Sequence, residues 1–120
     1  MGLLDRIRDR GAPRTAAEAD RLALRQLAAR GADLARARHV VHVLSAADRE
    51  RAEAAAEAAR ELGYEVAIEP PGAEGGEWTI RASGERVLAP DTVSAFRAAF
   101  ERIAETTGAA YDGWEAAPRP

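Results

Sequence analysis

The chain has 120 residues, enough for one domain, and its 47 % hydrophobic and 31 % charged residues are typical of a soluble globular protein. The absence of cysteine excludes disulfides, thiolate metal sites and cysteine nucleophiles, and no apolar run approaches the ~20 residues that cross a bilayer. The formal net charge of −3 argues against a nucleic-acid-binding surface, and we expect a cytoplasmic protein because residues 1–14 lack the apolar core of a signal peptide.

Residues 1–14 form a short charged amphipathic segment ahead of the first long helix. Leu3, Leu4 and Ile7 lie at helical spacing among acids and arginines. This pattern is compatible with docking on a membrane surface or on a partner. We expect instead a short helix that caps the domain or frays.

A long amphipathic helix is predicted over 15–30. Thr15 and Glu18 have the spacing of a capping box, and Gly31 is a helix stop signal. The apolar stripe of this helix comprises Ala19, Leu22, Ala23 and Leu27.

Residues 37–45, ARHVVHVLS, are predicted to form a strand at the centre of a sheet. Val41 and Val43 fall on one side of the strand, and Val40 and Leu44 fall on the other. A strand that is apolar on both faces is usually central and covered on both sides. We therefore expect structure on both faces of this strand.

A second helix follows this strand, with a narrow face lined by alanine. Ser45 is expected to cap it, with Asp48 at the reciprocal position, and Gly63 is expected to end it. The small residues on its apolar face predict close packing on the sheet; that face comprises Ala52, Ala55, Ala56, Ala59 and Leu62.

Two segments of alternating character, 64–70 and 77–82, predict the next two strands, with the glycine-rich turn 72–76 between them. In each segment every second residue is apolar, so one side of each strand is expected to face the core. The inward positions are Tyr64, Val66 and Ile68 in the first segment and Trp78, Ile80 and Ala82 in the second.

The last helix is predicted over 90–108, with Asp91 as its cap and Gly108 as its stop. A short final strand then follows over 109–114. The helix carries one continuous apolar stripe, formed by Val93, Phe96, Phe100, Ile103 and Ala104.

The predicted element order is a helix followed by β-α-β-β-α-β, the split βαβ pattern of ferredoxin-like folds. The usual strand order of that fold, 4-1-3-2, places the first strand at the centre and the fourth beside it at an edge. We therefore predict an α+β fold, a ferredoxin-like antiparallel sheet with an added N-terminal helix. The domain is expected to span 15–116, with the charged segment 1–14 before it and a tail at 117–120.

No arrangement of residues in the sequence predicts catalysis. His39 and His42 lie three apart on a strand, and therefore on opposite faces, so they cannot chelate one metal ion together. One histidine is expected to pack against a helix and the other to be partly exposed. The glycines of 72–76 lie between two strands rather than before a helix, so a phosphate cradle is not expected. We therefore expect no enzyme activity, no metal and no cofactor.

RNA binding is a minority hypothesis. RNA-recognition domains share the βαββαβ order and stack bases on exposed aromatic residues of their sheet. The predicted third strand offers Trp78 alone, and Glu77 flanks it without a basic and aromatic run.

The stretch TTGAAYDGWEA (106–116) places a tyrosine and one of the two tryptophans near the end of the sequence. Asp112 and Gly113 predict a bulge, because glycine accepts positive φ and an extra residue re-aims the next side chain. Trp114 is then expected to fold over the sheet edge or the first helix, although exposed tyrosine and tryptophan are equally typical of protein interfaces. We predict one partner-contact patch formed by Tyr111, Asp112, Gly113 and Trp114, with His42 on the neighbouring strand.

The sequence resembles the RraB family, the regulators of ribonuclease E activity, in two stretches: VVHVLSAADRERAEAAAEAARELGYEV (40–66) and AAYDGWE (109–115). The shared pattern is a strand ending in H-x-L-S-x-x-D, an alanine-rich helix, LGYEV and a terminal YDGW. The resemblance implies a ferredoxin-like fold with a leading helix, and a non-enzymatic protein that binds ribonuclease E and lowers its activity. Family members known for inhibition carry a long acidic carboxy-terminal tail, whereas six residues follow Trp114 here.

Two other functions stay open beside RNA binding. One is a ferredoxin-like domain that senses a small molecule and dimerises through its edge strands. The other is a protein-interaction domain with a different partner.

Overall fold

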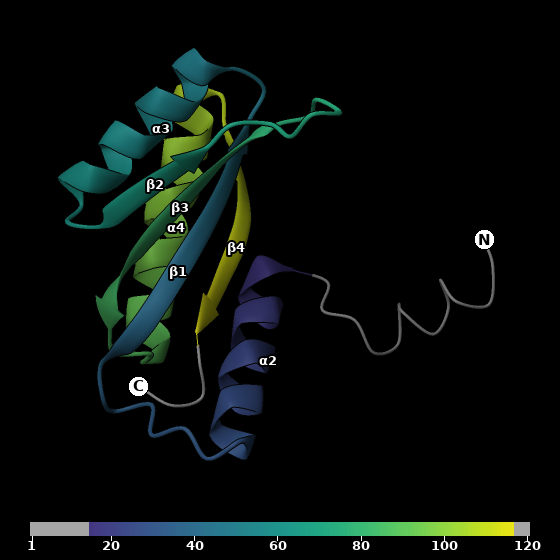
Figure 1. Cartoon of the computed structure of the whole chain (residues 1–120). Helices are drawn as coiled ribbons and strands as arrows, with labels where there is room; N and C mark the ends of the chain where they lie inside the picture. Colours follow the sequence, from purple (N-terminus) through teal and green to yellow (C-terminus); the bar gives the residue numbers. More distant parts are fainter. Residues whose placement is uncertain (1–14, 117–120) are drawn as a thin grey trace.

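The computed structural model describes residues 15–116, so the predictions for 1–14 and 117–120 lie outside the described residues (Figure 1). The elements, in chain order, are α2 (Ala16–Ala29), β1 (Arg38–Ala46), α3 (Arg49–Glu61), β2 (Glu65–Glu69), β3 (Trp78–Arg86), α4 (Pro90–Thr107) and β4 (Ala110–Ala116). None of the described helices is both long enough and apolar enough to cross a membrane.

The four strands form one antiparallel sheet in the order β2-β3-β1-β4. This is the predicted order 4-1-3-2 read from the other edge, and it confirms the α+β, ferredoxin-like architecture with an added N-terminal helix. β1 pairs along its whole length with β3, from Arg38 opposite Arg86 to Ala46 opposite Trp78. β4 is an edge strand beside β1, as predicted.

The helices pack on one side of the sheet. Figure 1 shows α3 and α4 behind the strands, with α2 beside β4. Alanines of α3 pack against Leu44 and Phe100 in one cluster of buried residues, and Leu24 and Leu27 of α2 pack with Val40 in a second cluster. The narrow alanine face of α3 therefore brings this helix close to the sheet, as its sequence predicts, but Leu62, which was predicted on the same face, follows the helix and is exposed.

The opposite side of the sheet has no described helix over it, and we call it the open face. The prediction that both faces of β1 are covered is wrong. Val40 and Leu44 are fully buried under the helices, whereas Val41, Val43 and Ser45 point to the open face and are half-buried. β1 lies between β3 and β4, so the residues of these two strands cover part of its side chains although no described helix lies over them.

Two predicted helix caps differ from those of the structure. α3 begins after Asp48, whose carboxylate accepts the Arg51 backbone N–H at 2.8 Å, while Ser45 lies within β1. α4 begins at Pro90 after Ala89, without a side-chain cap, and Asp91 lies in the first turn. Proline at the first helical position has no N–H that needs a cap, which explains the start at Pro90.

The strand β3 is longer than predicted. The alternation in the sequence ends at Ala82, but the strand continues to Arg86 because Ser83 to Arg86 pair with β1. The residues of this extension are polar or glycine and do not alternate with apolar residues, so the sequence does not predict that they belong to a strand.

Candidate functional site

The middle of β4 carries the bulge that the Asp-Gly pair predicts. Tyr111 lies opposite Leu44 and Gly113 lies opposite Val43, so Asp112 is the extra residue of the bulge. Gly113 has a φ of 116°, a conformation that favours glycine. Residues three apart on a regular strand face opposite sides, but the extra residue turns Trp114 to the same side as Tyr111. Both aromatic rings therefore face the helices.

Trp114 ties β4 to α2. Its indole Nε1–H donates a hydrogen bond to Oδ1 of Asp20 at 2.8 Å, and its ring meets Phe96 edge to face at a centroid distance of 5.5 Å. Asp20 is 6 % exposed, so its carboxylate depends on partners within the protein. The clasp half of the prediction for Trp114, contact with the first helix, is confirmed.

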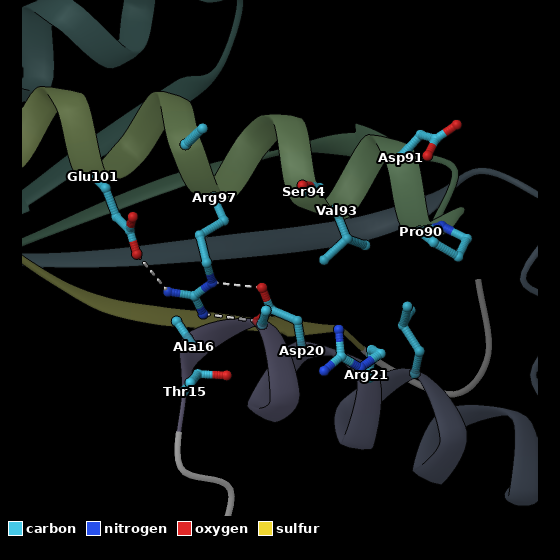
Figure 2. Close-up of a pocket in the computed structure, with 13 residues that line it drawn as sticks. Thr15, Ala16, Asp20, Arg21, Pro90, Asp91, Val93, Ser94, Arg97 and Glu101 are labelled. Carbon is cyan, nitrogen blue, oxygen red and sulfur yellow. Dashed lines mark hydrogen bonds and ion pairs between the residues drawn. The ribbon is translucent and has the colours of Figure 1, made fainter.

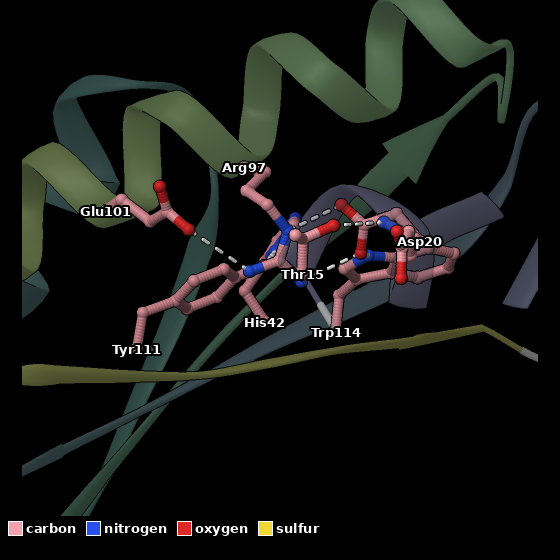
Figure 3. Close-up of polar contacts among 8 residues, drawn as sticks. Thr15, Asp20, His42, Arg97, Glu101, Tyr111 and Trp114 are labelled. Atoms are coloured by element: carbon pink, nitrogen blue, oxygen red, sulfur yellow. Dashed lines mark hydrogen bonds and ion pairs between the residues drawn. The ribbon is translucent and has the colours of Figure 1, made fainter. Parts of the chain in front are cut away.

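Arg97 of α4 supplies the counter-charge for Asp20. Its Nε and Nη2 atoms donate to the two carboxylate oxygens at 2.5 and 2.7 Å, and its Nη1 donates to Glu101 at 3.3 Å (Figure 3). The hydrogen bonds and charge of Asp20 raise the pKa of Arg97. One carboxylate thus joins α2, α4 and β4, and we call Asp20, Arg97 and Trp114 the clasp.

His42 lies next to the clasp in the core. It is fully buried, and its ring stacks on Phe100 at a centroid distance of 4.0 Å. Its Nδ1 shares a hydrogen bond with the Tyr111 hydroxyl at 2.8 Å, and its Nε2 has no hydrogen-bond partner among the described residues. Burial, with the positive charges of Arg86 and Arg97, lowers the pKa of His42 to about 4. The imidazole is therefore neutral at physiological pH.

Tyr111 completes this internal network. Its ring stacks on Phe100 at 5.4 Å, and the guanidinium of Arg97 lies over its ring at 5.2 Å from the centroid. Burial raises the pKa of Tyr111, so its hydroxyl keeps its proton. A neutral phenol and a neutral imidazole share one hydrogen bond in the core, where a fully buried His42 cannot reach a substrate.

A groove of about 610 Å³ lies between α2 and α4 above the clasp (Figure 2). Leu24 and Val93 contribute its apolar lining, and Asp20, Arg97 and Glu101 contribute polar groups. Of the two arginines that line the groove, Arg21 and Arg97, the guanidinium of Arg97 is already paired with two carboxylates. The groove therefore offers a ligand little electrostatic attraction from Arg97.

The five predicted contact residues are divided between the two sides of the sheet. The helix side of the sheet holds His42, Tyr111 and Trp114. Asp112 is exposed on the open face, where its carboxylate accepts a hydrogen bond from the Ser45 hydroxyl at 3.5 Å. Gly113 forms the bulge between them. The five residues do not form one surface patch, because His42 has no exposed surface. Contact of a partner with the exposed parts of Tyr111, Asp112 and Trp114 stays a prediction.

Sequence reasoning missed Asp20 and Arg97. The buried side of α2 consists of Asp20, Leu24 and Leu27, whereas the predicted stripe placed Ala19, Leu22 and Ala23 there instead. The available signal for Asp20 is its position four residues before Leu24, on the same side of the helix, where an acid needs a partner. Its partner lies 77 residues away on α4, and no local pattern indicates that pairing.

Two other kinds of site, a metal centre and a base-stacking surface, are not formed by residues 15–116. No three histidine or acidic side chains there are arranged to hold a metal ion. Trp78 faces the helices opposite Ala46, and no Phe, Tyr or Trp ring in this range lies on the open face, where the exposed His39 places its imidazole. The surface that stacks bases in RNA-recognition domains therefore offers one imidazole here and no larger aromatic ring.

Comparison with known proteins places these features in one family. A search of curated proteins found no match. The family model described as RraB, regulator of ribonuclease activity B, matches residues 17–116, which contain all seven described elements except the first residue of α2. The match includes Asp20, Arg97 and Trp114, the three residues of the clasp. The chain therefore belongs to the RraB family of regulators of ribonuclease activity.

Proposed function

We propose that this protein binds ribonuclease E, or a related RNA-decay protein, and lowers its cleavage of RNA without catalysing a reaction itself. Family membership over residues 17–116 carries this proposal. A cytoplasmic location follows from a partner of this kind. The regulator acts, in this proposal, through protein–protein contact.

The polar groups of the core support a non-enzymatic role. Asp20, Arg97 and Trp114 satisfy one another, and His42 shares its hydrogen bond with Tyr111. Catalytic groups need access to a substrate. These groups instead hold α2, α4 and the sheet together, which leaves the surface as the part that acts.

The test is a titration of the purified protein against ribonuclease E from its own host, with binding and RNA cleavage followed in the same samples. We expect the cleavage rate to fall as the complex forms, with half-inhibition at a concentration that matches the Kd. Absence of binding at micromolar protein would contradict the proposal. Binding with an unchanged rate of RNA cleavage would show that the protein binds ribonuclease E but does not inhibit it.

A matched experiment separates this function from RNA binding. A protein that sequesters RNA would bind the substrate alone, and its affinity would fall steeply with salt. We expect no binding of single-stranded RNA at the concentrations that inhibit cleavage. Two results together would favour sequestration of RNA instead: inhibition that disappears when the RNA substrate is in excess over the protein, and no detectable complex between the protein and ribonuclease E.

A further inference from the structure

We propose that the open face of the sheet docks a basic, RNA-binding polypeptide segment of the ribonuclease partner, an inference that rests on the proposed function. The open face is the side of the sheet that the described helices leave uncovered. Its centre is apolar, since Val41 and Val43 lie there side by side along β1. An apolar centre with a polar rim is the usual anatomy of a protein interface.

The rim of the open face is acidic. The three strands other than β1 each carry one or more carboxylates on this face, and Arg81 of β3 is the one guanidinium among them. Five carboxylates against one guanidinium leave a formal charge of −4, of the −6 that residues 15–116 carry with 18 acids against 12 arginines. The negative charge of the protein is therefore concentrated on this side. The five are Glu65, Glu69, Glu85, Asp112 and Glu115.

Most of these carboxylates are available to a partner. Arg81 pairs with Glu69 at 3.1 Å, and Asp112 is 3.5 Å from the Ser45 hydroxyl. Glu65, Glu85 and Glu115 are exposed and form no ion pair within residues 15–116. They stand on three different strands, β2, β3 and β4, so they surround the apolar centre. A hollow of about 330 Å³, lined by residues that include Val41 and Glu115, gives this surface a depression that a partner side chain can enter.

The charge identifies the chemistry of the occupant. An acidic rim attracts arginine and lysine, and electrostatic complementarity raises the rate and specificity of association. It repels RNA phosphates and would also repel the same face of a second copy of this chain. A ribonuclease that holds RNA needs basic segments for the phosphate backbone. The occupant that fits is such a segment, with arginine or lysine flanking an aliphatic residue that contacts Val41 and Val43.

This docking mode implies a means of inhibition. The acidic face would occupy the cations that otherwise hold RNA, so this protein and RNA would compete for one segment of the ribonuclease. The clasp plays no direct part, because Asp20 and Arg97 lie on the other side of the sheet.

The test compares two triple variants that lose the same charge. The face variant Glu65→Gln/Glu85→Gln/Glu115→Gln neutralises the open face. The control variant Glu57→Gln/Glu61→Gln/Glu105→Gln removes three exposed carboxylates from α3 and α4. Circular dichroism and thermal unfolding first establish that both variants fold like the parent protein, as exposed substitutions of this kind generally do.

We expect the face variant to bind ribonuclease E at least about tenfold more weakly, and the control variant to bind within about twofold of the parent. Raising the salt from 50 to 300 mM (roughly a halving of the Debye length) should weaken the parent complex more than that of the face variant. Added single-stranded RNA should raise the apparent Kd of the parent. Equal affinities of the two variants would overturn the docking face while leaving the proposed function intact.

A second probe decides the inference if the parent protein does not bind ribonuclease E, an outcome that would overturn the proposed function. The probe is a synthetic peptide of alternating arginine and valine, titrated into isotope-labelled protein and followed by amide chemical shifts. Shifts confined to the open-face strands, and lost in the face variant but not in the control variant, would support docking of a basic segment. Shifts spread over the helices, or absent, would overturn it.

Discussion

Trp114 combines a packing contact and a hydrogen bond in one side chain, and the two can be separated by substitution. Its ring packs on Phe96, while its Nε1–H satisfies a buried carboxylate that would otherwise lack one donor. The residue is half-buried, so part of it remains at the surface. A structural role and a contact role can therefore coexist in this residue.

We predict that Trp114→Phe lowers the free energy of unfolding by about 2 kcal/mol, because a hydrogen bond to a charged group is lost while most of the ring packing is kept. Trp114→Ala should cost more, since it also leaves a cavity beside Phe96. Urea unfolding of both variants measures these losses. A Trp114→Phe variant as stable as the parent would show that the hydrogen bond to Asp20 contributes nothing.

The same variants test the predicted contact role of Trp114. If the residue only holds α2, folded Trp114→Phe protein should bind ribonuclease E with the parental affinity. A loss of binding in a variant that remains folded would identify an anchor at the interface.

His42 makes the stability of the protein depend on pH. In the unfolded chain its pKa is near 6.5, whereas in the folded protein burial lowers the pKa to about 4. Between these two pH values the unfolded state binds more protons than the folded state. The free energy of unfolding therefore decreases as the pH falls from 6.5 towards 4. We predict a loss on the order of 3 kcal/mol across this window.

The variant His42→Asn isolates this contribution. An asparagine amide can reach the position of Nδ1 and hydrogen-bond Tyr111, but it does not titrate. Urea unfolding at intervals from pH 7 to pH 4 should show a shallower dependence for the variant than for the parent. Parallel profiles for the two proteins would contradict the assignment to His42.

At the scale of elements, the bulge in β4 decides which way the chain presents its aromatic residues. Tyr111 and Trp114 have odd spacing, and a regular strand would send one of them to the open face. The extra residue Asp112 and the positive φ of Gly113 place both rings under the helices. Two adjacent residues thereby convert an edge strand into the attachment point of α2.

We predict that Gly113→Ala destabilises the protein by about 1–2 kcal/mol, because an L-residue at this φ clashes with its own backbone. A Cβ at Gly113 meets no atom within 4 Å, so the cost comes from the backbone alone. Gly72→Ala is the control, since it has equal space and no positive φ. Thermal unfolding should separate the two variants; an unchanged midpoint for Gly113→Ala would mean that the bulge relaxes at no cost.

At the scale of the whole molecule, α2 is the element with the fewest attachments. It contacts the rest of the domain through Leu24, Leu27 and the hydrogen bonds of Asp20, whereas α3 and α4 cover the centre of the sheet. Elements with few buried contacts open at a lower free energy than the core. The clasp therefore sets how often α2 leaves the sheet.

We predict that native-state hydrogen exchange finds α2 less protected than α4 in the parent protein. Asp20→Asn should accelerate exchange in α2 at least about tenfold, because it removes the charge that pairs with Arg97 and loosens the helix by more than 1.4 kcal/mol. Amides of β1 should remain protected. Uniform acceleration across the sheet would show that α2 does not open on its own.

Local patterns determined most of the architecture. Alternation in β2, the alanine face of α3 and the apolar stripe of α4 each have one period and one buried side, so their element types and the ferredoxin-like order follow from the sequence. The caps at Ser45 and Asp91 were predicted wrongly, because several polar residues near a helix start compete for one position. The extension of β3 was missed since pairing with β1, rather than its own residues, sustains it.

The bulge, too, could be predicted from the sequence, because an Asp-Gly pair within an apolar strand has few other conformations. Only the tertiary structure decided which residues it brings together: Trp114 meets Asp20 across 94 positions, and Arg97 meets it across 77. It also decided that His42 is sealed in the core and that the other face of the sheet stays open and acidic. The physical reason is range: period and turn chemistry act between near neighbours, whereas burial and charge pairing depend on where distant segments come to lie.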